Sequence, residues 1–180
     1  MKLGEYLKRH PELERVVLAA VECLPGGREL LEVEVGFREM GGFAGYADPE
    51  ERRVVFASDP PDAETVLHEL LHIAGEDEWG AIVFPRILLR CAERGVRCNV
   101  LELRRLRLAD IDAAAREAGG MEGLEELLNA IGVYDLVKTE AEVSEELAVE
   151  EVLGWLAVLA KWDEACRRIL DRLLERSAER

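Results

Sequence analysis

The spacing of apolar residues changes its period along this chain. Residues 11–24 carry apolar side chains at helical intervals, and the proline and two glycines of the sequence LPGG then end that helix. Residues 31–37, LEVEVGF, instead alternate strictly, with Glu32 and Glu34 opposite the apolar side chains. These two patterns predict a helix followed by a half-buried strand.

Two further strands and a series of helices follow in the pattern. Residues 41–58, GGFAGYADPEERRVVFAS, predict a strand, a turn at 47–51 and a second strand at 53–57. After Asp59 the apolar residues recur at helical spacing almost to the end of the chain. The expected helices span residues 62–74, 78–95, 107–118, 121–132 and 144–175, the last one interrupted near Gly154 or Trp162.

This order of elements predicts an α+β fold. A small antiparallel or mixed sheet is expected to pack on the helix at 62–74, and a mainly helical half follows it. A chain of 180 residues is long enough to bury a substantial core and is most often one domain. We therefore expect a single domain at 1–180, with a sheet-containing core at 1–95 and a helical subdomain at 96–180.

Composition and charge restrict the classes of partner. Apolar residues make up 49% and charged residues 34% of the chain, as in a soluble globular protein. The net charge of -15 disfavours nucleic acids and anionic membranes, because both need a positive surface, and it favours cationic peptides or metal ions. The N-terminus lacks the apolar centre of a signal peptide, and the longest apolar run, at 152–160, is too short to span a bilayer. We expect a cytoplasmic protein.

The four cysteines form no CxxC pair, so reduced structural thiols are expected. A disulfide between Cys91 and Cys98 remains an alternative. The chain has no Gln, two Asn and many Arg and Glu, a composition typical of thermophiles, and intracellular disulfides occur in hyperthermophiles.

The helix expected at 62–74 has a clear start and end. Asp59 can cap its N-terminus, Pro60 suits the first helical position, and Gly75 ends it. Most of its circumference is apolar. A single polar stripe interrupts that surface and consists of Thr65, His68, Glu69 and His72.

That polar stripe predicts a metal site. Two imidazoles and a carboxylate on an otherwise buried helix would cost on the order of several kcal/mol if they had no partner. Histidines four residues apart direct two nitrogens to one point, where a zinc ion can satisfy both. Glu69, directly after the first histidine, is then placed to accept a proton from water at the metal.

The sequence His68-Glu69-Leu70-Leu71-His72 resembles the HExxH motif of the zincin metallopeptidases. The preceding order of a Gly-aromatic strand, a turn and RRVVFAS is similar to the minimal zincin core, in which an edge strand precedes the active-site helix. The resemblance covers residues 31–80. It implies a zinc-dependent peptidase in which His68 and His72 bind Zn²⁺ and Glu69 is the general base.

The third ligand is predicted to be Glu78. HELLHIAGEDE resembles the metzincin pattern HExxHxxGxxH/D, with Gly75 at the glycine and Glu78 at the last position, although a Met-turn is missing. It also resembles short phage- and archaeal-type HELLH proteins, in which an acidic residue opens the next helix. Glu76 and Asp77 are near alternatives. Another possibility is that the EDE triplet only caps the next helix.

A glutamate from farther along the chain is the competing third ligand. The stretch TEAEVSEELAVEEVLGWLAV, at 139–158, resembles the glutamate helix of the gluzincins, with Glu146 and Glu150 beside its apolar stripe.

The expected function is hydrolysis of peptide bonds in a peptide or protein substrate. The alternative is a latent or non-catalytic zincin-like protein in which zinc is structural and the chain binds or regulates other proteins. Substrate specificity and oligomeric state are not predicted by these patterns.

Overall fold

The computed structural model describes residues 1–178, apart from the side chain of Leu101. It is an α+β structure with a small mixed sheet, as the sequence predicts. The chain divides into two compact units, Met1–Arg97 and the residues from Cys98 onward.

The first unit contains the sheet. Its elements are α1 (Leu3–Leu7), α2 (Pro11–Val21), the 3-10 helix η1 (Gly27–Glu32), β1 (Glu34–Phe37), β2 (Gly45–Asp48), β3 (Arg53–Phe56), α3 (Ala63–Ile73) and α4 (Glu78–Arg94).

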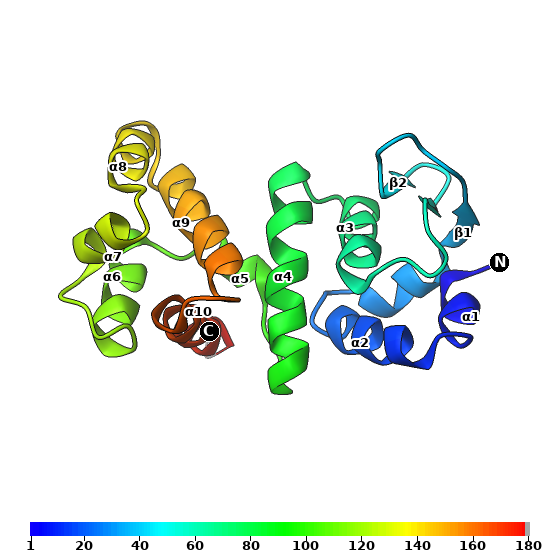
Figure 1. Cartoon of the computed structure of the whole chain (residues 1–180), viewed down its shortest axis with the longest axis horizontal. Coiled ribbons are helices and arrows are strands. Elements are labelled where there is room, and N and C mark those ends of the chain that lie inside the picture. Colours follow the sequence, from blue (N-terminus) through cyan, green and yellow to red (C-terminus); the bar gives the residue numbers. More distant parts are fainter. Residues whose placement is uncertain (179–180) are drawn as a thin grey trace. The chain divides into compact units, whose positions relative to one another are not determined.

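The sheet has the strand order β1-β3-β2, so β3 is central and β2 lies at an edge. β1 is parallel to β3, whereas β2 is antiparallel to it, with Gly45 opposite Phe56. Val54 and Phe56 of β3 are fully buried, which places the core on the face of the sheet that they share. The helix α3 packs against β2 and β3 on one side and against α2 and α4 on others (Figure 1).

Two expectations about the strands are wrong. The stretch expected to be a strand at 31–37 is extended only at Glu34–Phe37. Its first two residues belong to the 3-10 helix η1, which starts at the glycine pair 26–27 and continues through Glu32. The stretch RRVVFAS is the central strand and not the edge strand. In so small a sheet, a central strand and an edge strand show the same alternation of buried and exposed residues. The sequence therefore could not indicate which of the three strands lies at an edge.

The N-cap of α3 is Asp62 and not Asp59. The side chain of Asp62 accepts a hydrogen bond from the Thr65 amide at 2.7 Å. Asp59 instead accepts a hydrogen bond from the Tyr6 hydroxyl, and His10 Nε2 lies 3.7 Å from the same carboxylate. The two prolines at 60–61 therefore belong to the connection from β3 and not to the helix.

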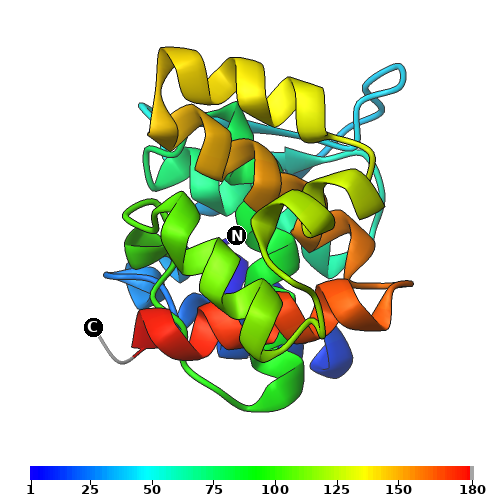
Figure 2. The same ribbon diagram turned by 90° about the vertical axis from the view of Figure 1, so that its left-hand side faces the viewer.

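The second unit is helical. Its elements are α5 (Val100–Leu103), α6 (Leu108–Glu117), α7 (Leu124–Ala130), α8 (Tyr134–Val143), α9 (Glu145–Leu159) and α10 (Glu164–Ala178). α9 packs on α8 and α10, and α10 also packs on α5 and α6 (Figure 2). The expected long helix at 144–175 is broken at 160–163, next to Trp162, whereas α8 was not predicted.

No helix among the described residues is both long enough and apolar enough to cross a membrane. The cysteines at 23, 91, 98 and 166 are all buried and form no disulfide, so Cys91 and Cys98 are not bonded to each other.

Candidate metal centre

The polar stripe of α3 lies as its spacing predicts. Val66, Leu67, Leu70 and Leu71 are buried around the rest of the helix, while the side chains of His68 and His72 are each about one-quarter exposed. The two imidazole rings lie edge to face with centroids 4.9 Å apart. The helix thus presents both histidines to solvent from an otherwise buried element.

Glu78 completes a group of three potential ligands. It is the first residue of α4, and its carboxylate oxygens lie 3.1 Å from His72 Nε2 and 3.6 Å from His68 Nε2. One ligand atom from each of the three residues lies within 4.8 Å of the others. Two atoms that are each about 2.1 Å from a tetrahedral ion are ~3.4 Å apart, and the two distances from Glu78 to the histidines are close to that value. The three residues can therefore hold one metal ion.

The turn between α3 and α4 explains how Glu78 reaches the histidines. Gly75 has a φ of 96°, which glycine adopts without strain. The Glu76 amide then donates to the Leu71 carbonyl at 2.9 Å, which closes the end of α3. Asp77 caps α4 by accepting a hydrogen bond from the Gly80 amide at 2.8 Å. The acidic triplet at 76–78 thus includes a helix cap, but the cap is Asp77, and Glu78 is left to face the histidines.

The backbone of Glu76 also orients His72. Its carbonyl oxygen lies 3.2 Å from His72 Nδ1. A carbonyl can only accept, so a hydrogen bond at this contact is one that Nδ1 donates, and Nε2 is the ring nitrogen that faces Glu78. The carboxylate of Glu76 is not part of the three-residue group.

Glu69 is the only charged residue among the described ones that is buried, with 6% of its surface exposed. Its Oε1 lies 3.9 Å from His68 Nε2, beside the candidate ligands. Burial raises the pKa of this carboxyl group, Glu78 adds to the increase, and the two histidines oppose it. A carboxyl group of raised pKa therefore lies beside the three candidate ligands.

Gly45 of β2 packs directly against the side chain of Glu69. The sequence patterns did not single out this glycine. A Cβ atom built on Gly45 would lie 3.0 Å from Glu69 Cγ and 3.2 Å from Oε1. Only a residue without a side chain allows β2 and α3 to approach so closely. The available signal was the glycine itself, because a glycine inside a strand often marks a close approach of two segments.

The competing glutamates are not part of this group. Glu146 and Glu150 belong to α9 of the second unit, and Glu150 forms an ion pair with Arg104 at 3.2 Å. Neither they nor Asp77 belong to the group of three. The assignment of His68, His72 and Glu78 as metal ligands stays a prediction. The geometry shows that one ion could lie within reach of all three residues.

This chain matches no protein-family model, no curated protein and no solved structure. The interpretation of the centre therefore rests on its geometry.

Proposed function

We propose that this chain is a zinc-dependent metallopeptidase. The observation that carries the proposal is the buried carboxyl group of Glu69 beside three convergent ligands, 3.9 Å from His68 Nε2. A purely structural metal site needs no buried carboxyl group next to it that stays outside the ligand set. A peptidase needs one as its general base.

The ligand set supports zinc as the metal. Two imidazole nitrogens and one carboxylate oxygen are a set typical of catalytic zinc, which keeps a further position open. Glu78 is 68% exposed, so the ligand group faces solvent and not a closed core. Zinc bound there would act as a Lewis acid that polarises a peptide carbonyl and lowers the pKa of water to near neutrality.

The side chains of this chain would then perform three tasks. His68, His72 and Glu78 fix the ion, and the hydrogen bond from His72 Nδ1 to the Glu76 carbonyl keeps that ring in position. Glu69 accepts a proton from the water that attacks the carbonyl carbon. It passes the proton to the amide nitrogen when the carbon–nitrogen bond breaks, so that an acid and an amine leave.

The substrate is proposed to be an extended or unfolded polypeptide. β2 lies at the edge of the sheet and passes directly over Glu69, where its backbone can pair with an extended chain. The net charge of -15 favours cationic substrates over acidic ones.

The test combines metal analysis with hydrolysis. Protein purified without chelators should contain one zinc per chain and cleave a mixed library of quenched fluorescent peptides. Glu69→Gln should keep the zinc and lose about 10²–10⁴-fold in rate. Glu64→Gln is the matched control, because Glu64 lies on the same helix, pairs with Arg86 and is not one of the three candidate ligands. Bound zinc without hydrolysis in the wild-type protein would favour the latent or regulatory alternative, and absence of zinc would contradict both.

A further inference from the structure

Helix α9 is apolar around most of its circumference. One side is buried where α9 packs on α8 and α10, and it includes Val152, Leu153 and Leu156. The opposite side is also largely apolar, yet Leu147 is 41% exposed and Trp155 is 39% exposed. A helix that is apolar on all sides is normally enclosed by other elements. The described part of the chain leaves this side of α9 open.

The exposed side chains form one stripe along the helix. This α9 stripe consists of Leu147, Glu151, Trp155 and Val158, which follow one another at intervals of three or four residues and so share a face. From Leu147 to Val158 the stripe is about 16 Å long. Glu151 accepts a hydrogen bond from Trp155 Nε1 at 3.0 Å, which satisfies the indole N–H and leaves the rest of the ring as apolar surface.

The segment that carries the α9 stripe is strongly negative. Residues 139–160, the end of α8 and the whole of α9, contain six glutamates and no lysine or arginine, and one lysine flanks each end. Glu145 and Glu150 form ion pairs with arginines of the same unit at 2.8 and 3.2 Å. The other four glutamates, among them the exposed Glu142 and Glu146, carry charge that no cation within this segment balances.

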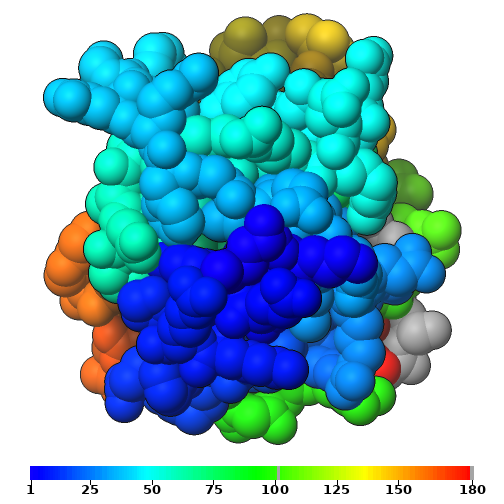
Figure 3. All heavy atoms as spheres, turned by 90° about the vertical axis from the view of Figure 1, so that its right-hand side faces the viewer, coloured from blue at the N-terminus to red at the C-terminus, as the bar shows by residue number. Residues whose placement is uncertain are grey.

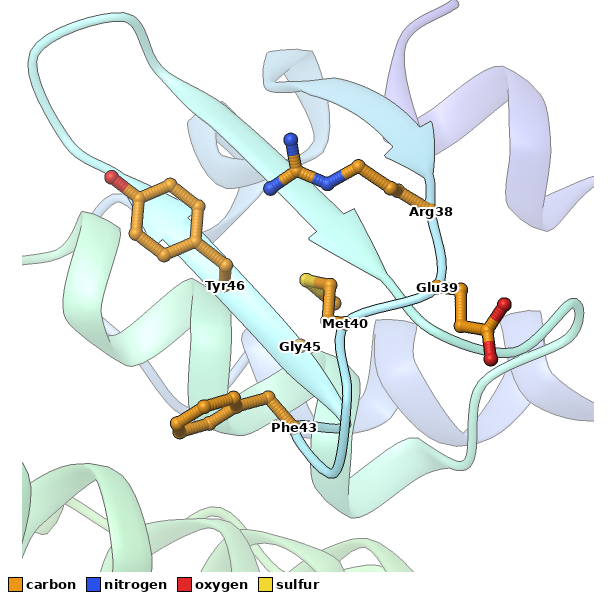
Figure 4. Close-up of a pocket in the computed structure, with 6 residues that line it drawn as sticks. All are labelled: Arg38, Glu39, Met40, Phe43, Gly45 and Tyr46. Atoms are coloured by element: carbon orange, nitrogen blue, oxygen red, sulfur yellow. The ribbon is translucent and has the colours of Figure 1, made fainter.

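An exposed aromatic surface of the first unit differs from the α9 stripe in its charge. The segment between β1 and β2 projects from that unit (Figure 3). Its Phe43 is 74% exposed and, with Tyr46, borders a cavity of about 420 Å³ (Figure 4). Arg38 and Glu39 both belong to the lining of this cavity, so it favours no sign of charge in a ligand. Only the α9 stripe combines exposed apolar side chains with a one-sided charge among these two surfaces.

We propose that the α9 stripe is a docking site for a cationic amphipathic helix of another polypeptide. Apolar side chains of such a helix pack on Leu147, Trp155 and Val158, and its lysines or arginines lie near the glutamates of α8 and α9. Burial of the apolar side chains supplies binding energy, and the opposite charges orient the helix and accelerate its association. A helix of about three turns matches the length of the stripe. The proposal does not depend on the proposed peptidase function.

The same charges disfavour other occupants of the α9 stripe. A second copy of this chain would bring its own six glutamates against the first, which places like charges opposite each other. Nucleic acids and anionic lipid surfaces are repelled for the same reason. A cationic helix covers the apolar stripe and also relieves the repulsion among the glutamates.

The first test measures binding of a defined probe. Fluorescently labelled acetyl-LKKLLKLLKKLLKL-amide, which forms an amphipathic helix with lysines on one face, is titrated with Glu69→Gln protein, so that the proposed peptidase does not cut it. We expect affinity to fall at least about tenfold between low and high salt, because opposite charges are screened. The same peptide with glutamate in place of every lysine should bind at least about a hundredfold more weakly.

The second test locates the binding energy with variants. Trp155→Ala and Leu147→Ala should each weaken binding of the lysine peptide about tenfold, while thermal unfolding stays close to wild type because both side chains are exposed. Phe43→Ala is the matched control, since it removes an exposed aromatic ring from the first unit and should leave the affinity unchanged.

A charge variant tests the acidic surroundings of the stripe. The double variant Glu142→Gln, Glu146→Gln should weaken binding and reduce its dependence on salt. The double variant Glu12→Gln, Glu29→Gln is the matched control, because it makes the same change in net charge at two exposed glutamates of the first unit.

The third test identifies the site that the peptide occupies. Protein labelled with ¹⁵N shows the indole N–H of each tryptophan, and the Trp155 resonance is assigned with Trp155→Phe. The lysine peptide should shift the Trp155 resonance and leave that of Trp79, the residue after Glu78, in place.

The contrary outcomes are distinct. Binding that is unchanged in Trp155→Ala, or a shift of the Trp79 resonance without one at Trp155, would overturn the docking site and place the peptide elsewhere on the chain. Concentration-dependent dimers that form without peptide and are lost in Trp155→Ala would show that a second copy covers the stripe instead. Neither result bears on hydrolysis, which is tested separately through Glu69.

Discussion

Gly45 and Glu69 lie in contact across the boundary between strand β2 and helix α3. The position that a Gly45 side chain would occupy is 3.0 Å from Glu69 Cγ and 3.3 Å from Cδ. The carboxyl group of the proposed general base is therefore held between its own helix and strand β2, which has no side chain at the point of contact.

Gly45→Ala should displace the Glu69 side chain or move β2 outward. We expect a loss of about 1–3 kcal/mol in the free energy of unfolding, which is the usual cost of overpacking. Peptide hydrolysis should fall about 10²-fold because the carboxylate moves relative to the substrate. Urea unfolding and kcat/KM measure the two effects.

Gly36→Ala is the control for that variant. Its Cβ atom would meet the guanidinium of Arg53, the far end of a flexible side chain that can move away. A loss of activity in Gly36→Ala as large as in Gly45→Ala would contradict the role given to Gly45.

Much of the candidate centre followed from sequence because its parts are local. The helical spacing of His68 and His72 fixes their common face, and Gly75 and Glu78 follow within one short turn. The geometry of a helix and of its C-terminal turn is nearly independent of the rest of the fold. The structure accordingly brings Glu78 to the two histidines, as the resemblance to HExxHxxGxxH/D implies.

The parts that sequence could not provide depend on long-range packing. The position of β3 in the centre of the sheet depends on which strands pair, and the alternation of apolar residues does not specify this order. The contact between Gly45 and Glu69 joins residues on two elements, and the glycine in the strand indicates a close approach without indicating which residue it meets. The cap at Asp62 was misassigned because Asp59 and Asp62 are both followed by residues that suit a helix start.

Glu78→Gln should weaken zinc binding at least tenfold, because an amide oxygen is a much poorer ligand than a carboxylate for a cation. Competition with a chromophoric chelator measures the affinity. Glu76→Gln is the matched control, since it makes the same change two residues earlier while its backbone carbonyl still orients His72. Unchanged zinc affinity in Glu78→Gln would give the ligand role to another carboxylate.

Removal of the metal should lower stability. At a free zinc concentration of 100 times Kd, binding adds about 2.7 kcal/mol to the free energy of unfolding, and a chelator should remove this contribution. Thermal unfolding with and without chelator measures it. The difference should disappear in a His68→Ala, His72→Ala double variant, and its persistence there would place the stabilising ion elsewhere.

Asp62→Ala should cost about 1 kcal/mol of stability, because the Thr65 amide at the start of α3 loses its hydrogen-bond acceptor. Asp62→Asn keeps an acceptor oxygen at the same position and should be close to wild type. Chemical unfolding distinguishes them. Equal losses in both variants would mean that charge and not capping is responsible.

Asp112 should make the stability of the second unit pH-dependent. A hydrogen bond from Arg116 and one from the Leu124 amide, at 2.7 Å, hold the pKa of its carboxyl group below the usual value. Because the folded-state pKa is lowered, the stabilisation is present above about pH 3.9 and is lost as pH falls through the lowered value.

Asp112→Asn removes that titration and keeps an acceptor for Leu124. The side chain is about one-third exposed, so we expect a difference of only about 0.5–1 kcal/mol at pH 7. Unfolding in urea from pH 7 to pH 3 should show the wild type and the variant converging at the acidic end. A constant difference across that range would show that the ionised carboxylate is not the source.

The short turn that carries Glu78 back to His72 affects the order in which the parts of the proposed metal centre form during folding. The three ligands lie between residues 68 and 78, so closing the site costs little chain entropy and requires only two helix ends. Glu69, in contrast, is enclosed only when the sheet has docked on α3. An early folding species in which only α3 and its turn have formed could thus bind zinc before Glu69 is enclosed. Such a species would hold the metal but would not hydrolyse peptides until β2 has packed on α3.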